Sequence, residues 1–171
     1  MVGDLTEKIQ ASQGKLEALV AKIPGYAGYK KKEQRREADK LLRLHVAKQY
    51  EEQLAKLNQV QYDLTLQGRL RVLVTLERAS MKLQLLIDRI KTASYGYAGL
   101  FDAVKVQEDE LTKLYQFDEE MLSSVDALAG AIAAVAQRGE TEDPSAEAGA
   151  LVKLLEELNL TFSHRQDVLI S

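Results

Sequence analysis

Apolar residues recur at intervals of three and four along most of the chain, with charged and polar residues between them. This spacing places the apolar side chains on one face of an α-helix, so it predicts amphipathic helices that pack through these faces. Five such segments are predicted, at residues 4–22, 29–66, 69–93, 101–138 and 145–169. At 1.5 Å per residue, the second segment corresponds to a rod of roughly 55 Å.

The predicted helices are separated by residues that favour turns. Pro24 and Gly25 end the first helix, because proline bars continuation and glycine permits the reversal. Gln67 and Gly68 predict a C-terminal cap followed by a tight turn. The acidic stretch 139–144 predicts a polar linker before the last helix. These breaks arrange the chain as two helix–glycine-loop–helix hairpins and a C-terminal helix.

The third segment, 69–93, is the most apolar of the five. Further apolar residues beside a heptad-like row widen its apolar surface well beyond one face. The row consists of Leu73, Leu76, Ser80, Leu83, Ile87 and Ile90. The widening residues are Leu70, Val72, Val74, Met81, Leu85 and Leu86. A helix that is apolar around its circumference either lies at the centre of a bundle or faces a second subunit.

The composition agrees with a helical protein. Only two prolines and no tryptophan occur in 171 residues, and no runs of Val, Ile and Thr between turn clusters indicate strands. Sustained heptads with short connections favour antiparallel neighbours. The sequence therefore predicts an all-α fold, a single domain over residues 1–171 that forms an elongated antiparallel bundle of about five helices with coiled-coil-like packing.

The net charge of −3 conceals a division between the two halves of the chain. Residues 1–100 contain 18 Lys and Arg against 11 Asp and Glu, a net charge of +7, whereas residues 101–171 contain 5 against 15, a net charge of −10. This division indicates that the halves pack together, that subunits associate head to tail, or that the basic half binds an anionic partner.

No pattern indicates catalysis or a bound cofactor. The absence of cysteine excludes disulfides, thiolate zinc sites and cysteine nucleophiles. A di-iron bundle needs Glu three residues before each histidine ligand, but Leu42 and Thr161 stand three residues before His45 and His164. We therefore expect a protein that is not an enzyme, with no metal or cofactor and no small-molecule substrate. Since there is neither a signal peptide nor an apolar run of about 20 residues, the expected location is the cytoplasm.

A basic stretch at the start of the second helix is the first candidate binding site. Cations are disfavoured at a helix N-terminus, so a phosphate, an anionic lipid or acidic side chains of the C-terminal half should compensate them. The candidate residues for binding an anion or a partner are Lys30, Lys31, Lys32, Arg35, Arg36, Lys40 and Arg43, with Tyr26 and Tyr29. Alternatively, local pairs with Glu33, Glu37 and Asp39 leave this stretch a solvated helix face.

The tetrapeptide Gly-Tyr-Ala-Gly occurs twice, at residues 25–28 and 96–99, each time between a shorter and a longer predicted helix. The second copy follows Tyr95 and includes Tyr97, so each loop offers tyrosines as a platform for a ligand. The alternative is structural, with Gly25, Gly28, Gly96 and Gly99 shaping the turns while the aromatic rings cap the bundle.

Asp118 is the one charged residue in the apolar row of the fourth helix. Such a residue fixes helix register or pairs with a base across the bundle. Arg165, in the stripe of the last helix, and Arg89 are the candidate partners, so Asp118 and Arg165 are predicted buried structural charges.

Two functions agree with these patterns. The first is a non-catalytic helical scaffold or adaptor that acts through protein–protein contacts, with another protein or with further copies of itself as the partner. The alternative is a peripheral binder of anionic surfaces, either membrane phospholipid or RNA, through the basic start of the second helix.

Overall fold

A computed structural model of the chain describes residues 32–93 and 108–170, with side chains described at 41, 43–93 and 119–164. This part of the chain is entirely helical apart from its turns and forms four helices. They are α2 (Lys32–Leu66), α3 (Leu70–Thr92), α5 (Glu108–Thr141) and α6 (Ser145–Ile170). The helix predicted at 4–22 lies outside the described residues.

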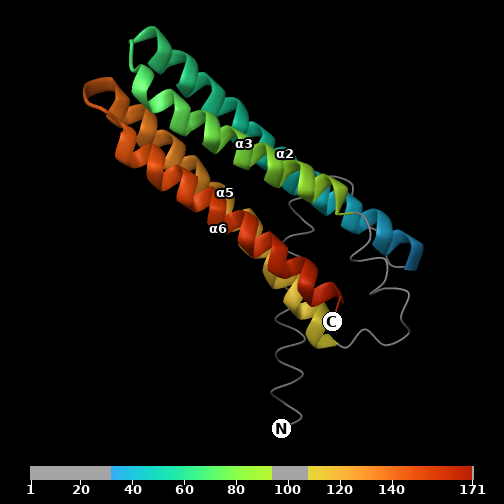
Figure 1. Ribbon diagram of the computed structural model, residues 1–171. Coiled ribbons are helices and arrows are strands. Elements are labelled where there is room, and N and C mark those ends of the chain that lie inside the picture. The colour runs from blue at the N-terminus through green and yellow to red at the C-terminus, as the bar shows by residue number, and fades with distance from the viewer. Residues whose placement is uncertain (1–31, 94–107, 171) are drawn as a thin grey trace.

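The four helices form an elongated bundle in which each helix has two neighbours (Figure 1). α2 packs against α3 and α5, and α6 packs against the same two helices. Around the bundle the order is therefore α2, α3, α6, α5, which places α3 diagonally opposite α5. The α2–α3 hairpin forms one side of the bundle, and the α5–α6 hairpin forms the other.

The helices are antiparallel within each hairpin but parallel between hairpins. Within the first hairpin, Arg43 near the start of α2 contacts Lys91 near the end of α3. Between hairpins, α2 and α5 run in the same direction, because Tyr50 contacts Met121 and, further along both helices, Leu64 lies beside Gly139. The expected antiparallel bundle is therefore wrong for the two contacts between hairpins. The reason is that the segment between α3 and α5 joins diagonal helices, whereas the prediction assumed that consecutive helices are neighbours.

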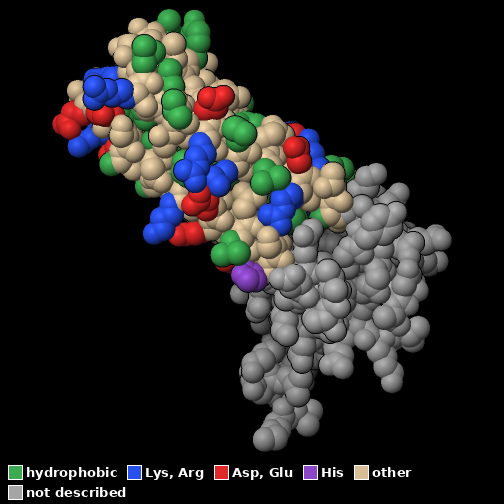
Figure 2. Space-filling model, viewed as in Figure 1, with side chains coloured by type: hydrophobic (Ala, Val, Ile, Leu, Met, Phe, Trp, Pro, Cys, Tyr) green, Lys and Arg blue, Asp and Glu red, His purple; other side chains and the backbone are tan. Residues whose placement is uncertain are grey.

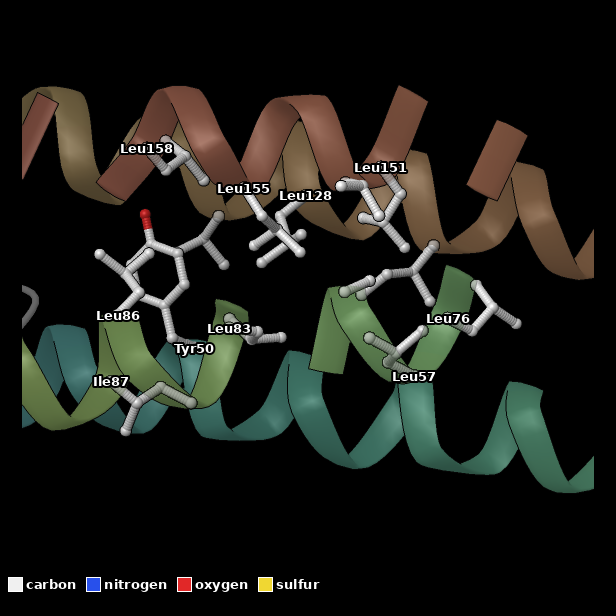
Figure 3. Close-up of a cluster of buried hydrophobic side chains, with 14 of the residues drawn as sticks. Tyr50, Leu57, Leu76, Leu83, Leu86, Ile87, Leu128, Leu151, Leu155 and Leu158 are labelled. Carbon is white, nitrogen blue, oxygen red and sulfur yellow. The ribbon is translucent and has the colours of Figure 1, made fainter. Parts of the chain in front are cut away.

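The core consists of apolar side chains that point inward from all four helices (Figure 3). Leu57, Leu83, Leu128 and Leu155, one from each helix, are all fully buried. Most of the predicted apolar row of the third helix is buried as well, at Leu76, Leu83, Ile87 and Ile90. The three-and-four spacing thus correctly identified the inward face of this helix.

Two predicted breaks have different outcomes. The turn at Gly68 is confirmed, because Gly68 has a positive φ of 73° and Arg69 N–H donates to Leu64 C=O at 2.9 Å. With Gly68 N–H donating to Thr65 C=O at 3.0 Å, this is a Schellman cap. The linker predicted at 139–144 is shorter, because α5 continues to Thr141.

Gly139 explains the longer helix. It follows Val135 by four residues and so continues the inward face of α5, where it is buried against Leu64. Glycine fits there because it has no side chain, so the backbone of α5 can lie close to Leu64 of α2.

In the described ranges, no helix is both long and apolar enough to cross a bilayer.

Candidate functional site

The outer surface of α3 carries a second set of large apolar side chains. Leu70 is 61% exposed, Val74 75%, Met81 68% and Leu85 53%. At about 100° per residue these four positions fall within an arc of about 60° on the helix. They lie opposite the buried face of α3, as the line of hydrophobic side chains over this helix in Figure 2 illustrates. We call these four residues the α3 stripe.

The apolar surface extends onto the helices beside α3. Tyr62 and Leu44 of α2 are exposed, and each directly follows a residue that binds α3, namely Gln61 and Arg43. Leu160 of α6 is also exposed and lies one turn after Glu156, which binds α3. The described side chains of α5 include none of the large exposed hydrophobic residues. The exposed apolar surface is therefore concentrated on the α3 side of the bundle.

Two charged residues interrupt the α3 stripe between Val74 and Met81. Glu77 is exposed, and Arg78 donates to Glu156 Oε1 of α6 at 3.0 Å. Lys82 Nζ lies 3.1 Å from the same oxygen. The hydrogen bond and charge of Lys82, followed by those of Arg78, lower the pKa of Glu156. These ion pairs join the basic half of the sequence to its acidic half, which is one of the three alternatives that the charge division left open.

A polar network fixes α3 against α6 and so directs the stripe outward. Arg89 donates to the backbone oxygen of Asn159 at 2.8 Å and to Ser163 Oγ at 2.7 Å, and its guanidinium lies 5.1 Å from the ring centroid of Phe162. The Asn159 amide donates in turn to the backbone oxygen of Lys82 at 3.1 Å. Such directional bonds select one rotation and one register of the two helices. The apolar pattern alone did not reveal this network.

The outer surface of α5, on the opposite side of the bundle, is lined with small residues. Ser123, Ala127, Gly130 and Ala134 follow one another at intervals of four, three and four. All four are exposed, so they form a shallow strip, which we call the α5 strip. Within the described part of the chain, no atom of another element lies within 4 Å of a Cβ placed on Gly130.

The basic stretch predicted to bind anions is described only in part. Residues 26, 29, 30 and 31 lie outside the described residues, and the side chains at 32, 35, 36 and 40 on α2 are likewise not described. Arg43 is described and is only 7% exposed, with its Nη1 donating to the backbone oxygen of Lys91 at 3.4 Å. Arg43 therefore contributes to the α2–α3 contact, and anion binding by the other residues stays a prediction.

Most of the remaining predicted site residues lie outside the described residues or have side chains that are not described. Gly25, Gly28, Gly96 and Gly99, with Tyr95 and Tyr97, lie outside the described residues. Asp118 and Arg165 belong to α5 and α6, but their side chains are not described. His45 is half-buried and His164 exposed. No cluster of three or more His, Asp or Glu suited to a metal ion occurs among the described residues.

Comparisons with protein-family models, with curated protein sequences and with solved structures found no match to this chain.

Proposed function

We propose that this chain is a non-catalytic scaffold or adaptor that acts through protein–protein contacts, and that the α3 stripe is the centre of its binding surface. The observation that carries the proposal is the exposure of four large apolar side chains in one row on the side of α3 that faces away from the core. Large exposed apolar side chains that gather on one face and are rimmed by polar groups are typical of interaction sites.

Burial of the exposed apolar side chains supplies free energy for binding. Covering one fully exposed Leu, Val or Met side chain contributes about 1.5–3 kcal/mol. The four residues of the α3 stripe are each between 53% and 75% exposed, so a partner that covers them recovers a large part of this free energy. Rigid support by the polar network of Arg89 and Asn159 keeps the loss of conformational entropy on binding small.

Capture of partners from the native cell, compared between variants, tests this function. The stripe variant carries Val74→Glu and Met81→Glu, two substitutions at exposed positions that leave the core intact. The control carries Ala146→Glu and Ala150→Glu, which add the same charge at exposed positions of α6. We expect the wild-type protein and the control to capture the same proteins and the stripe variant to lose them. Unchanged capture by the stripe variant contradicts the proposed function.

The alternative, binding to anionic membrane or RNA surfaces through residues 30–43, remains a second hypothesis. Its support is the density of Lys and Arg at this point of the sequence. A salt-dependent affinity separates it from the scaffold function, because phosphate contacts weaken steeply as salt rises whereas apolar contacts do not.

A further inference from the structure

The charges of the two hairpins differ in sign, and this difference points to a partner for the α3 stripe. Residues 32–93, which form the α2–α3 hairpin, contain 13 Lys and Arg against 8 Asp and Glu. Residues 108–170, which form the α5–α6 hairpin, contain 4 against 14. One side of the bundle is therefore basic and the other acidic. A second copy is attracted when its acidic side approaches the basic side of the first, and is repelled when two like sides meet.

The shapes of the two sides favour the same pairing of copies as the charges do. The α3 stripe presents large side chains at Val74, Met81 and Leu85, whereas the α5 strip presents only small ones along a similar length of helix. Large side chains of one helix pack closely on a second helix where that helix offers small residues. The bases Arg71 and Arg78 lie along one edge of the stripe, and the acids Glu77 and Asp88 lie along the other. The charge attraction therefore comes from the net charges of the two hairpins and not from the residues that flank the stripe.

From these observations we propose that the α3 stripe of one copy binds the α5 strip of a second copy of this chain. The proposal rests on the proposed function and names its partner. Because α3 and α5 are diagonal in the bundle, both surfaces of one molecule are available at once. The contact is heterologous, so it repeats and produces chains of molecules rather than a closed two-fold dimer.

The contact is small. A single pair of helix faces buries less than the interface of about 1,600 Å² that is usual for stable complexes. Association is therefore weak and depends on concentration, and raising the salt concentration weakens it further because charge attraction contributes. The average mass should rise continuously with protein concentration and pass beyond that of a dimer.

Two variants that each block one surface test the contact by analytical ultracentrifugation of the purified full chain. The stripe variant, Val74→Glu with Met81→Glu, blocks α3 and leaves the α5 strip intact. The strip variant, Gly130→Glu with Ala134→Glu, blocks α5 and leaves the α3 stripe intact. Both exposed positions of the strip variant accommodate glutamate, and replacing a helical glycine favours the helix. Thermal unfolding followed by circular dichroism checks that both variants are folded.

We expect each variant alone to be a monomer and their equimolar mixture to form a one-to-one dimer and nothing larger. In that mixture the stripe of the strip variant binds the strip of the stripe variant, and every other surface is blocked. The control variant, Ala146→Glu with Ala150→Glu, should associate like the wild type.

Three results overturn the proposal. They are a wild-type chain whose average mass does not rise with protein concentration, a strip variant that self-associates as the wild type does, and a mixture of variants that remains monomeric. Failure here is distinguishable from failure of the proposed function. If the pure chain is monomeric while the stripe variant still loses its captured proteins, then the partner is another protein and the function stands.

Discussion

Replacing Tyr50 by phenylalanine removes one hydroxyl from the centre of the bundle and leaves the ring in place. Tyr50 of α2 is completely buried, and its hydroxyl donates to the backbone oxygen of Met121 in α5 at 2.8 Å. This bond joins the two hairpins across a parallel helix contact. The variant therefore measures how much one buried polar contact contributes to holding the hairpins together.

At neutral pH we expect the variant to lose about 1 kcal/mol of the free energy of unfolding. A buried hydrogen bond contributes a net 0.5–1.5 kcal/mol, because the unfolded chain bonds to water instead. The loss is not larger, because the ring retains its packing and because a helical carbonyl oxygen such as that of Met121 has a second lone pair for the bond within its own helix.

The order of stability should reverse within about one pH unit above pH 10. Burial raises the pKa of the Tyr50 hydroxyl in the folded protein, against a weaker opposing effect of a hydrogen bond with Ser124, whereas in the unfolded chain the pKa is about 10. The stabilisation is therefore complete below pH 10 and is lost as the pH rises toward the higher pKa of the folded state. Each pH unit in this window costs the wild type up to about 1.4 kcal/mol that the variant does not lose.

Urea unfolding followed by circular dichroism at several pH values from 7 to about 11.5 measures both effects. The other tyrosines are common to both proteins and cancel in the difference. The reasoning is refuted if the phenylalanine variant is as stable as the wild type at pH 7 and the difference between them does not change with pH.

Three further predictions address the core, the turn and the basic stretch. Leu83→Ala should lower the free energy of unfolding by about 2–5 kcal/mol, whereas Leu85→Ala, at a position 53% exposed, should cost less than about 1 kcal/mol; equal losses in chemical denaturation contradict the assignment of the two faces of α3. Gly68→Ala should lower the free energy of unfolding by about 1 kcal/mol, because alanine is strained at a positive φ, while nothing lies within 4 Å of a Cβ there to add a steric clash. Thermal melts that show a gain in stability disprove the left-handed cap. Changing the lysines at residues 30–32 to glutamate should abolish any binding to anionic vesicles at low salt in a co-sedimentation assay, and unaffected binding rules this stretch out as an anion site.

Local signals in the sequence determined the secondary structure and the inward faces. Val125, Leu128 and Ile132 recur with the period of a helix, and this alone places them on one side of α5. Gly68 marks the end of α2 because only a residue that tolerates positive φ closes this cap at no cost. In contrast, Gly139 has the appearance of a breaker but lies inside α5, because a close approach by Leu64 from another helix favours glycine there.

The apolar excess of the third helix also follows from the sequence, which left open whether this helix lies at the centre of the bundle or faces a second subunit. In the tertiary structure, α3 has only two helical neighbours among the described residues, and its outer face leaves Val74 and Met81 exposed. Which helices are neighbours depends on the joint packing of all their faces and on how each connection crosses the bundle. A periodic pattern describes each helix separately, so it carries no information about these choices. The parallel contacts between hairpins, the network of Arg89 and the burial of Arg43 were accordingly decided by the fold.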